Sequence, residues 1–322
     1  MLRAICLITL LGLLSGPVFA IVVAGSDPNS SSVVATYNNS TFDGINLSGV
    51  VTITDSKAVC SGSLLADGLS ILTAGHCVTS AYGSPIATGI TVSFMGDHGF
   101  VQETVSNVQV DPGYNGDSDL GNDLAILTLS QPAPSFAVGY SLFTSSLIPS
   151  TPVVLAGYGY GGTGTNGANS GTYPFGTLRV GTNEYEENGH EFSNWSSQLL
   201  IGQFYDFSTS STNALGVAHP YSSSDEVDTS FGDSGGPTFY AGKIIGVHVL
   251  GICEGISVCD APPSEGSANN SYFGEMWADT SVAGNLRFIE DAEVPEPGSC
   301  SLVLLGLAAA GFLGRRTGRR PS

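Results

Sequence analysis

The chain has 322 residues, which is enough for one large all-β domain or two smaller ones. Between residues 21 and 297 it carries four basic residues against 28 acidic ones, so we expect no nucleic-acid binding through counterion release. Such a body attracts basic partners and repels acidic ones, although the same acidity also keeps an exported protein soluble.

Residues 1–20 have the pattern of a signal peptide. Arg3 gives a positive start, Ala4 to Leu14 forms an apolar core, and Val18-Phe19-Ala20 offers small residues before a cleavage site. Cleavage after Ala24 also fits the small-residue rule. A permanent membrane helix is disfavoured by the short core and by Gly16-Pro17. We therefore expect an exported protein in which disulfides can form.

Short apolar segments rich in Val, Ile and Thr alternate with Gly, Ser, Asn and Asp clusters along the body, which contains most of the 43 glycines. This pattern predicts many short strands joined by turns. The strands fall in two sets around a Pro- and Ser-rich connector at 128–152, which indicates two small antiparallel barrels. The expected strands are 49–55, 61–65, 70–73, 90–94, 101–110 and 124–129, then 153–157, 177–185, 199–204 and 243–250.

A glycine-dense segment lies between Gly157 and Tyr173. No strand–loop–helix unit surrounds it, so we expect a flexible surface excursion there and no nucleotide site.

Four cysteines lie between the two end segments of the chain, and four cysteines allow three pairings. The sequence-local pairing is the simplest, with Cys60 bonded to Cys77 and Cys253 bonded to Cys259. No Cys or His cluster has zinc-like spacing, so we expect no metal ligation by these residues.

Three segments together supply the parts of a nucleophilic serine centre. A serine hydroxyl needs a base, a group that holds the base, and donors where the oxyanion forms. His76 follows an expected strand and stands next to a cysteine, which suits a fixed base. Asp123 opens an apolar strand and can be aimed at an imidazole. Glycines on both sides of Ser234 permit a tight turn that exposes the amides of Gly232 and Ser234 to an oxyanion.

The segments TAGHC, NDLAIL and GDSGGP, in the order His76, Asp123 and Ser234, resemble the chymotrypsin/trypsin serine peptidase family. The resemblance implies that these three residues form the catalytic triad. It also implies an oxyanion hole at Gly232 and Ser234, and a disulfide between Cys60 and Cys77 beside the catalytic histidine.

The same resemblance covers residues 21–290 and implies an all-β fold of two antiparallel six-stranded β-barrels with the active site between them. The first barrel is expected at about 30–140 and the second at about 150–290. The signal peptide, residues 1–20, and a sorting tail, residues 291–322, flank this domain.

Specificity in this family is set largely by the residue six positions before the nucleophile, which here is Asp228. The resemblance implies that Asp228 pairs with Arg or Lys of a substrate, and that Gly251 and Gly274 keep the pocket open. The sequence departs from the family at Ser230, where a pocket cysteine is usual, and at Val249-Leu250, where Ser-Trp is usual. The pocket disulfide is therefore missing or replaced by Cys253–Cys259, and the alternative for Asp228 is a carboxyl directed at solvent.

Members of the family usually begin at an Ile-Val end created by proteolysis, and the new amine pairs with the acid before the nucleophile. In this chain the resemblance implies a pair between Ile21 and Asp233. Signal-peptide cleavage after Ala20 would create that amine without a separate propeptide.

The tail resembles the PEP-CTERM sorting signal of Gram-negative bacteria. Val294-Pro295-Glu296-Pro297 is followed by the apolar segment 301–314 and then by four arginines. The resemblance implies handling by an exosortase-type enzyme of the inner membrane, and a destination at the cell surface or in the extracellular matrix. A glycolipid-anchor signal or a plain membrane anchor with its basic end in the cytoplasm is the alternative.

An oxygen-rich loop precedes the strand that Asp123 opens. It contains Asp111, Asn115, Asp117, Asp119 and Asn122, whose spacing does not match an EF-hand. Calcium binding is one interpretation, and turn-forming Asp and Asn side chains explain the composition equally well.

Together these features predict a cofactor-independent serine endopeptidase that hydrolyses proteins or peptides after basic residues. A catalytically silent surface- or matrix-binding protein on a protease scaffold is one alternative. An esterase that uses the same triad is the other. The intact set of triad residues argues against the first, and Asp228 argues against the second.

Overall fold

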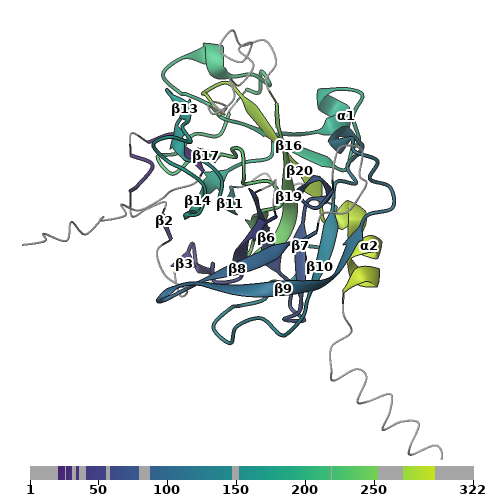
Figure 1. Cartoon of the computed structure of the whole chain (residues 1–322). Helices are drawn as coiled ribbons and strands as arrows, with labels where there is room; N and C mark the ends of the chain where they lie inside the picture. Colours follow the sequence, from purple (N-terminus) through teal and green to yellow (C-terminus); the bar gives the residue numbers. More distant parts are fainter. Residues whose placement is uncertain are drawn as a thin grey trace, which may run out of the picture.

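The computed structural model describes residues 21–25, 27–30, 34–35, 41–55, 59–79, 88–146, 152–218, 220–252 and 271–293 (Figure 1). The expected signal peptide, the pair Cys253–Cys259 and the sorting tail lie outside these residues. Within the described ranges, no helix has the length and apolar character that a membrane span requires.

Six antiparallel strands close into a barrel in the first half of the chain, in the order β10-β7-β6-β5-β8-β9. Large apolar side chains such as Ile53, Leu72, Phe94 and Ile126 are almost fully buried. Each contributes about 1.5–3 kcal/mol relative to an exposed position. The strands are β5 (Val50–Thr54), β6 (Val59–Leu64), β7 (Ser70–Thr73), β8 (Thr91–Gly96), β9 (Gly99–Val110) and β10 (Ala125–Leu129).

The second half of the chain builds an eight-stranded sheet in the order β15-β16-β20-β19-β18-β11-β14-β2, which is consistent with a second barrel. Two bridges, Leu65 with Tyr140 and Leu142 with Ile244, tie the connector to both halves. The strands are β2 (Val34–Ala35), β11 (Val153–Gly157), β14 (Leu178–Asn183), β15 (Glu187–Asn188), β16 (Leu199–Gln203), β18 (Pro237–Tyr240), β19 (Lys243–Ile252) and β20 (Met276–Ser281).

A four-stranded sheet joins the start of the described chain to the segment that precedes the nucleophile. Its order is β13 (Gly167–Ala168), β12 (Gly162–Thr163), β1 (Val22–Val23) and β17 (Val227–Asp228). The expectation of a flexible excursion after Gly157 is therefore wrong. A Cβ at Gly162 would lie 2.0 Å from the carbonyl oxygen of Gly167, so this glycine allows two backbones to approach closely.

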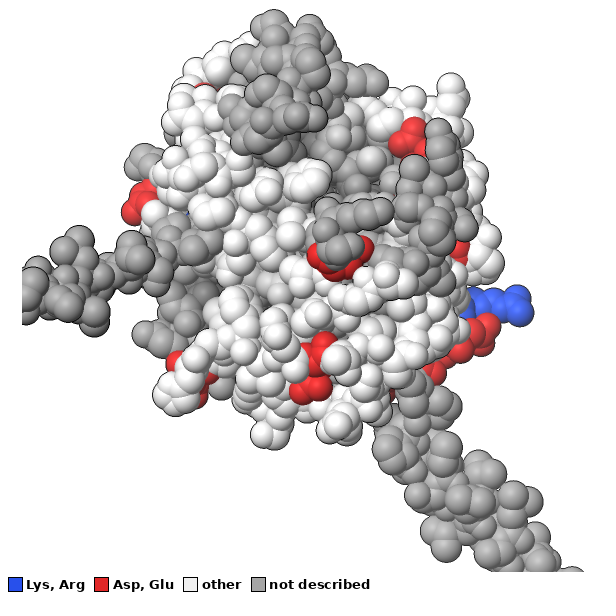
Figure 2. Space-filling model, in the orientation of Figure 1, with Lys and Arg blue, Asp and Glu red and all other residues white. Residues whose placement is uncertain are grey.

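The remaining elements are short. They are the hairpin of β3 (Thr41–Phe42) and β4 (Ile45–Asn46), the 3-10 turns η1 (Gly75–Cys77), η3 (Ser118–Leu120), η4 (Ser210–Thr212) and η5 (Ala283–Asn285), and the helices α1 (Gly189–Phe192) and α2 (Leu286–Ala292). Figure 2 shows separate acidic groups spread over one face, with basic atoms only at its edge.

Candidate active site

His76 and Asp123 come from neighbouring strands of the first barrel. His76 lies in η1 directly after β7, and Asp123 lies two residues before β10, which pairs with β7 through Ala125 and Thr73. The imidazole Nδ1 is 2.7 Å from Asp123 Oδ2, and the backbone N–H of His76 donates to Asp123 Oδ1 at 2.9 Å. Strand pairing therefore brings together two residues that are 47 positions apart.

Asp123 is fully buried, whereas the His76 side chain is about one-third exposed. Burial alone would raise the pKa of Asp123, but the charge of His76 and hydrogen bonds from His76 and Ser118 lower it below its ordinary value. The hydroxyl of Ser118, in η3, donates to Asp123 Oδ2 at 2.5 Å. An ionised carboxylate held by three donors keeps the Nδ1–H of the imidazole directed at it and leaves Nε2 for the nucleophile.

Ser234 lies in the loop between β17 and β18, and strand β6 of the first barrel holds this loop. The backbone N–H of Ser61 donates to the carbonyl oxygen of Ser234 at 2.8 Å. The Ser61 hydroxyl donates to the carbonyl oxygen of Gly232 at 2.9 Å and accepts from the N–H of Tyr158 at 2.9 Å. Ser61 thus fixes the nucleophile loop of one half of the chain against the other half.

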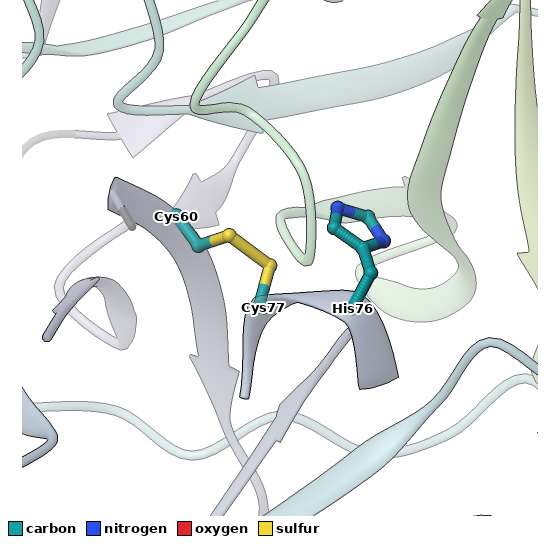
Figure 3. Close-up of side chains that lie close together, drawn as sticks. All are labelled: Cys60, His76 and Cys77. Atoms are coloured by element: carbon teal, nitrogen blue, oxygen red, sulfur yellow. A yellow bond between two sulfur atoms is a disulfide. The ribbon is translucent and has the colours of Figure 1, made fainter. Parts of the chain in front are cut away.

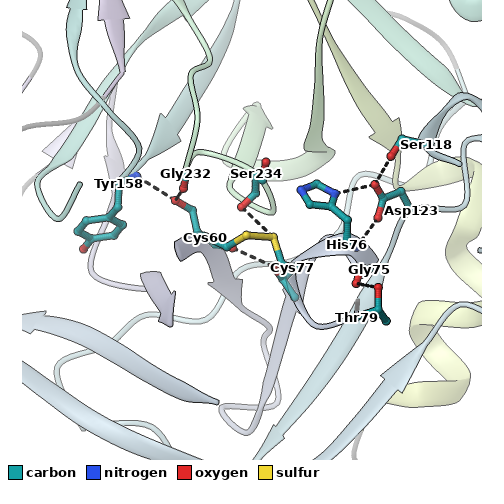
Figure 4. Close-up of a disulfide and its surroundings, with 12 residues drawn as sticks. Cys60, Gly75, His76, Cys77, Thr79, Ser118, Asp123, Tyr158, Gly232 and Ser234 are labelled. Carbon is teal, nitrogen blue, oxygen red and sulfur yellow. Dashed lines mark hydrogen bonds and ion pairs between the residues drawn. A yellow bond between two sulfur atoms is a disulfide. The ribbon is translucent and has the colours of Figure 1, made fainter. Parts of the chain in front are cut away.

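The imidazole of His76 lies between Asp123 and Ser234 (Figure 4). Among the described residues, the Ser234 hydroxyl makes no hydrogen bond to His76. Such contacts often tighten only when substrate binds.

The glycines around Ser234 have positive φ angles that favour glycine, 97° at Gly232 and 81° at Gly235. Within the described chain, the backbone amides of Gly232 and Ser234 donate no hydrogen bond to the protein, whereas those of Asp233, Gly235 and Gly236 all do. Two unused neighbouring donors are what a developing oxyanion requires.

The disulfide between Cys60 and Cys77 is present and stands next to His76 (Figure 3). Its Cys77 sulfur lies 3.5 Å from the carbonyl oxygen of Ser234. The two sulfurs and the imidazole lie within 4.8 Å of one another, but sulfurs bonded to each other are not the thiolates that a metal needs. This cluster is therefore a structural brace of the site.

Asp233 is fully buried behind the nucleophile. Its carboxylate accepts from the N–H of Gly159 at 2.7 Å and from the N–H of Ser230 at 2.9 Å. Burial raises the pKa of Asp233 to about 6, against the lowering effect of these bonds and of the charge of His248. A Cβ at Gly157 would lie 2.2 Å from Asp233 Oδ1, so the glycine-dense segment begins with residues that make room for this carboxylate.

Ile21 is fully buried at the start of β1, where Val22 pairs with Asp228 of β17. Its φ of 57° is in the left-handed region, which a β-branched residue strongly disfavours. Its nitrogen is in a peptide bond to Ala20 and carries no charge, so a pair with Asp233 can form only after cleavage at this bond.

A cavity of about 240 Å³ lies next to Ser234, at the position expected for the specificity pocket. It is lined by Thr229, Ser230, Phe231, Ser234, His248, Val249, Leu250 and Gly251. Gly251 is one of its lining residues, whereas Gly274, with a φ of 96°, is not among them.

Asp228 is not among the residues that line this cavity and is 1% exposed, so the solvent-directed alternative is wrong. Burial raises its pKa well above the ordinary value, and the nearby charges of Glu275, Asp233 and Glu226 raise it further. In the described structure, Asp228 Oδ1 has no hydrogen-bond partner.

Ser230 takes over part of the role of the pocket cysteine that the sequence lacks. Its hydroxyl donates to the carbonyl oxygen of Tyr160 and lies 3.1 Å from Asp233 Oδ2. The loop before the nucleophile is therefore fixed by hydrogen bonds at this position.

The oxygen-rich loop before Asp123 uses several of its side chains in turns. Asp111 accepts from the N–H of Gly113 at 2.7 Å, Asn115 accepts from that of Asp117 at 3.1 Å, and Asp117 accepts from that of Asp119 at 3.1 Å. These bonds favour the turn-forming interpretation over a calcium site.

The sequence analysis did not identify Ser118, Ser61 or Gly159 as parts of the site. Serine and glycine are common in loops, and no local pattern separates these from the others. Their roles depend on which distant residue each one meets.

A closed barrel, a second sheet consistent with another barrel, and a histidine–aspartate pair beside a serine are the features of a chymotrypsin-type serine peptidase fold. Residues 39–264 match the trypsin family model, and residues 293–320 match the PEP-CTERM protein-sorting motif. The chain is 26% identical to trypsin zeta of Drosophila erecta over 70% of its own length and 74% of that protein. It is 27% identical to trypsin beta of Drosophila erecta, over 58% of its own length and 66% of that protein. The chain belongs to the trypsin family.

Proposed function

We propose that this protein is an exported serine endopeptidase that cleaves peptide bonds through an acyl-enzyme. The His76–Asp123 pair, with Ser234 beside it and the amides of Gly232 and Ser234 unused, is the observation that carries the proposal. Membership of the trypsin family supports the same reaction class.

In the proposed mechanism the Ser234 hydroxyl attacks the substrate carbonyl while His76 Nε2 takes its proton. Asp123, held buried by three donors, stabilises the imidazolium. The negative charge on the carbonyl oxygen is received by the amides of Gly232 and Ser234. His76 then returns the proton to the leaving amine, and water releases the acyl group by the reverse sequence.

We further propose cleavage after Arg and Lys. Asp228 is a buried carboxyl with one oxygen that lacks a partner in the described chain, and its acidic neighbours, Glu275 foremost, raise its pKa further. A substrate guanidinium or ammonium that reaches it from the cavity would supply a positive partner. The ion pair would bring the Asp228 carboxyl into its charged form, which the empty pocket disfavours.

We also propose activation by export, and the burial of Ile21 beside β1 supports it. The φ angle of Ile21 is defined only while Ala20 is attached to it. Cleavage after Ala20 would therefore remove the strain of its left-handed conformation. The new ammonium would start from a buried residue of the sheet that adjoins the nucleophile loop, and Asp233 is the carboxylate it would pair with. The PEP-CTERM motif supports a destination at the surface of a Gram-negative cell, with an exosortase-type enzyme acting on the tail.

A fluorophosphonate probe tests the proposed chemistry directly, because it labels only an activated serine. We expect the exported protein to be labelled and Ser234→Ala to remain folded but unlabelled. Triad residues act as a unit, so cleavage of peptides by Ser234→Ala should fall by several orders of magnitude. An unlabelled parent would favour the silent binding protein, and a labelled parent that cleaves esters but no peptides would favour the esterase.

A further inference from the structure

A second histidine–carboxylate pair lies buried beneath the nucleophile loop. His248 on β19 and Asp279 on β20 are directly opposite each other in the sheet. His248 Nδ1 is 2.8 Å from Asp279 Oδ1, and the two side chains are 2% and 0% exposed. Asp279 Oδ2 accepts from the hydroxyls of Tyr185 and Thr238, each at 2.5 Å. Both carboxyl oxygens of Asp279 therefore have partners, and the side chain holds the ring in one orientation.

The backbone of His248 is bonded to both residues that follow the nucleophile. The N–H of Gly235 donates to the His248 carbonyl oxygen at 2.7 Å, and the N–H of His248 donates to the Gly236 carbonyl oxygen at 3.0 Å. The ring itself lies under Gly236, because a Cβ at that position would be 3.0 Å from His248 Cδ2 and 2.8 Å from the Asp233 carbonyl oxygen. A shift of His248 would therefore move the segment that carries Ser234.

The imidazole also interacts electrostatically with Asp233, the acid that precedes the nucleophile. Burial disfavours a protonated His248, but Asp279 and Asp233 outweigh this cost, with help from the Ala156 carbonyl, and the pKa of His248 is raised. In return, the charge of His248 helps to lower the pKa of Asp233.

Few basic side chains lie around the pair in the described part of the chain. The titratable groups there are Asp279 on β20, Tyr185 in the segment after β14 and Asp233 in the nucleophile loop, and none of them is basic. Arg179 on β14 is a further cation influenced by Asp233, but its guanidinium donates to the Pro28 carbonyl oxygen at 2.6 Å.

We propose that His248 is a positioning residue of the nucleophile loop: its imidazolium, held by Asp279 beneath Gly236, is an internal counter-ion of Asp233. In this role it keeps the amides of Gly232 and Ser234 in place. The inference rests on the proposed function for its effect on catalysis. The ionisation of His248 can be measured without catalysis.

The direct test is a pH titration of the full exported chain, labelled with ¹³C-histidine, by NMR. The chain has five histidines, and the His248 signal is the one that His248→Asn removes. We expect its midpoint above the ordinary 6.5, and lower in Asp279→Asn. If His248 stays neutral from about pH 5 to about pH 7, the range in which a histidine ordinarily titrates, the inference is wrong.

The second test compares the pH profile of fluorophosphonate labelling in the parent, His248→Asn and Thr238→Val. Asn keeps a donor for Asp279 but carries no charge, so Asp233 should lose the positive charge of His248 and keep only the proposed ammonium of Ile21. In His248→Asn we expect the acidic side of the labelling profile to shift to higher pH by about one unit. The labelling rate at pH 6, relative to the rate at pH 8, should therefore fall by about tenfold. Thr238→Val removes one bond to Asp279 without removing charge and should keep the parental profile.

A His248→Asn profile that runs parallel to the parental one would contradict the positioning role. If His248→Asn shows no cooperative unfolding, Asp279→Asn replaces it, because the histidine is then present but less protonated. A parent that is never labelled would refute the proposed function, and the NMR titration would still decide the ionisation of His248.

Discussion

The hydroxyl of Ser118 donates to Oδ2 of Asp123 at 2.5 Å, on the same oxygen that faces the His76 imidazole. Val249 and Leu250, which stand where the family usually has Ser-Trp, offer no hydroxyl to the site. The 3-10 turn η3 therefore provides a polar partner for the buried carboxylate from the first barrel itself.

We predict that Ser118→Ala lowers kcat/KM for peptide substrates by about tenfold, because a hydrogen bond to a charged group contributes about 1.5–3 kcal/mol and other bonds to Asp123 remain. Ser118→Thr retains a hydroxyl and serves as the control. Steady-state kinetics at a fixed pH, with thermal unfolding to confirm the fold, give the measurement. Equal kcat/KM for Ser118→Ala and the parent would show that Asp123 does not need this donor.

Asp228→Ser should remove the preference for Arg and Lys. The parental pocket would pair a buried carboxylate with the substrate cation, and the variant would leave that cation unpaired at a cost of several kcal/mol. A peptide-library cleavage profile of both proteins gives the answer. Asp225→Ser serves as the control, because Asp225 lies three positions before Asp228 and does not line the cavity. A parent that prefers apolar or acidic residues would refute the role assigned to Asp228.

The mature protein should begin at Ile21. N-terminal sequencing of the exported chain checks the cleavage site, and a variant with one residue added before Ile21 checks the role of the amine. We expect the added residue to lower the labelling rate of Ser234, because it would restore a φ constraint and displace the ammonium from Asp233. A start at Gly25 with full activity would eliminate this route, since β1 would then be absent.

Glu226 should make stability fall as pH rises. Burial raises its pKa from 4.5 to about 8, and the charges of Glu186 and Asp206 add to this effect. Between these two values the folded state retains a proton that the unfolded state has lost. The free energy of unfolding therefore decreases from about pH 4.5 to about pH 8 and the penalty is complete above that range.

Glu226→Gln should make the free energy of unfolding depend less on pH. At pH 8 it should raise Tm, because the variant gains at most about a few kcal/mol of stability there. Gln keeps an acceptor for the N–H of Tyr205, which lies 2.8 Å from Glu226 Oε1. Glu290→Gln, an exposed position on α2, is the matched control and should leave the pH dependence of Tm unchanged. Parallel Tm profiles for Glu226→Gln and the parent would contradict the prediction.

Each of the expected strands is present within two residues of its predicted ends. Two of the longer strands that the pattern did not predict are β18, which begins with Pro237 directly after the nucleophile motif, and β20, which contains Asp279. Proline at a strand start and an acid within a strand weaken the local pattern. Their partners in the sheet compensate for both, so periodicity alone did not reveal them.

The sequence by itself was enough to predict that His76, Asp123 and Ser234 form one site, because a nucleophilic serine centre leaves short local signatures around each residue. The tertiary structure alone decided which side chains support them. Ser118 reaches Asp123 only through the shape of η3, Ser61 reaches Ser234 across 173 positions only because the two halves pack together, and His248 meets Asp279 only through strand pairing. Hydrogen bonds and burial between distant residues depend on the packing of the whole chain, and for that reason no local pattern predicts them.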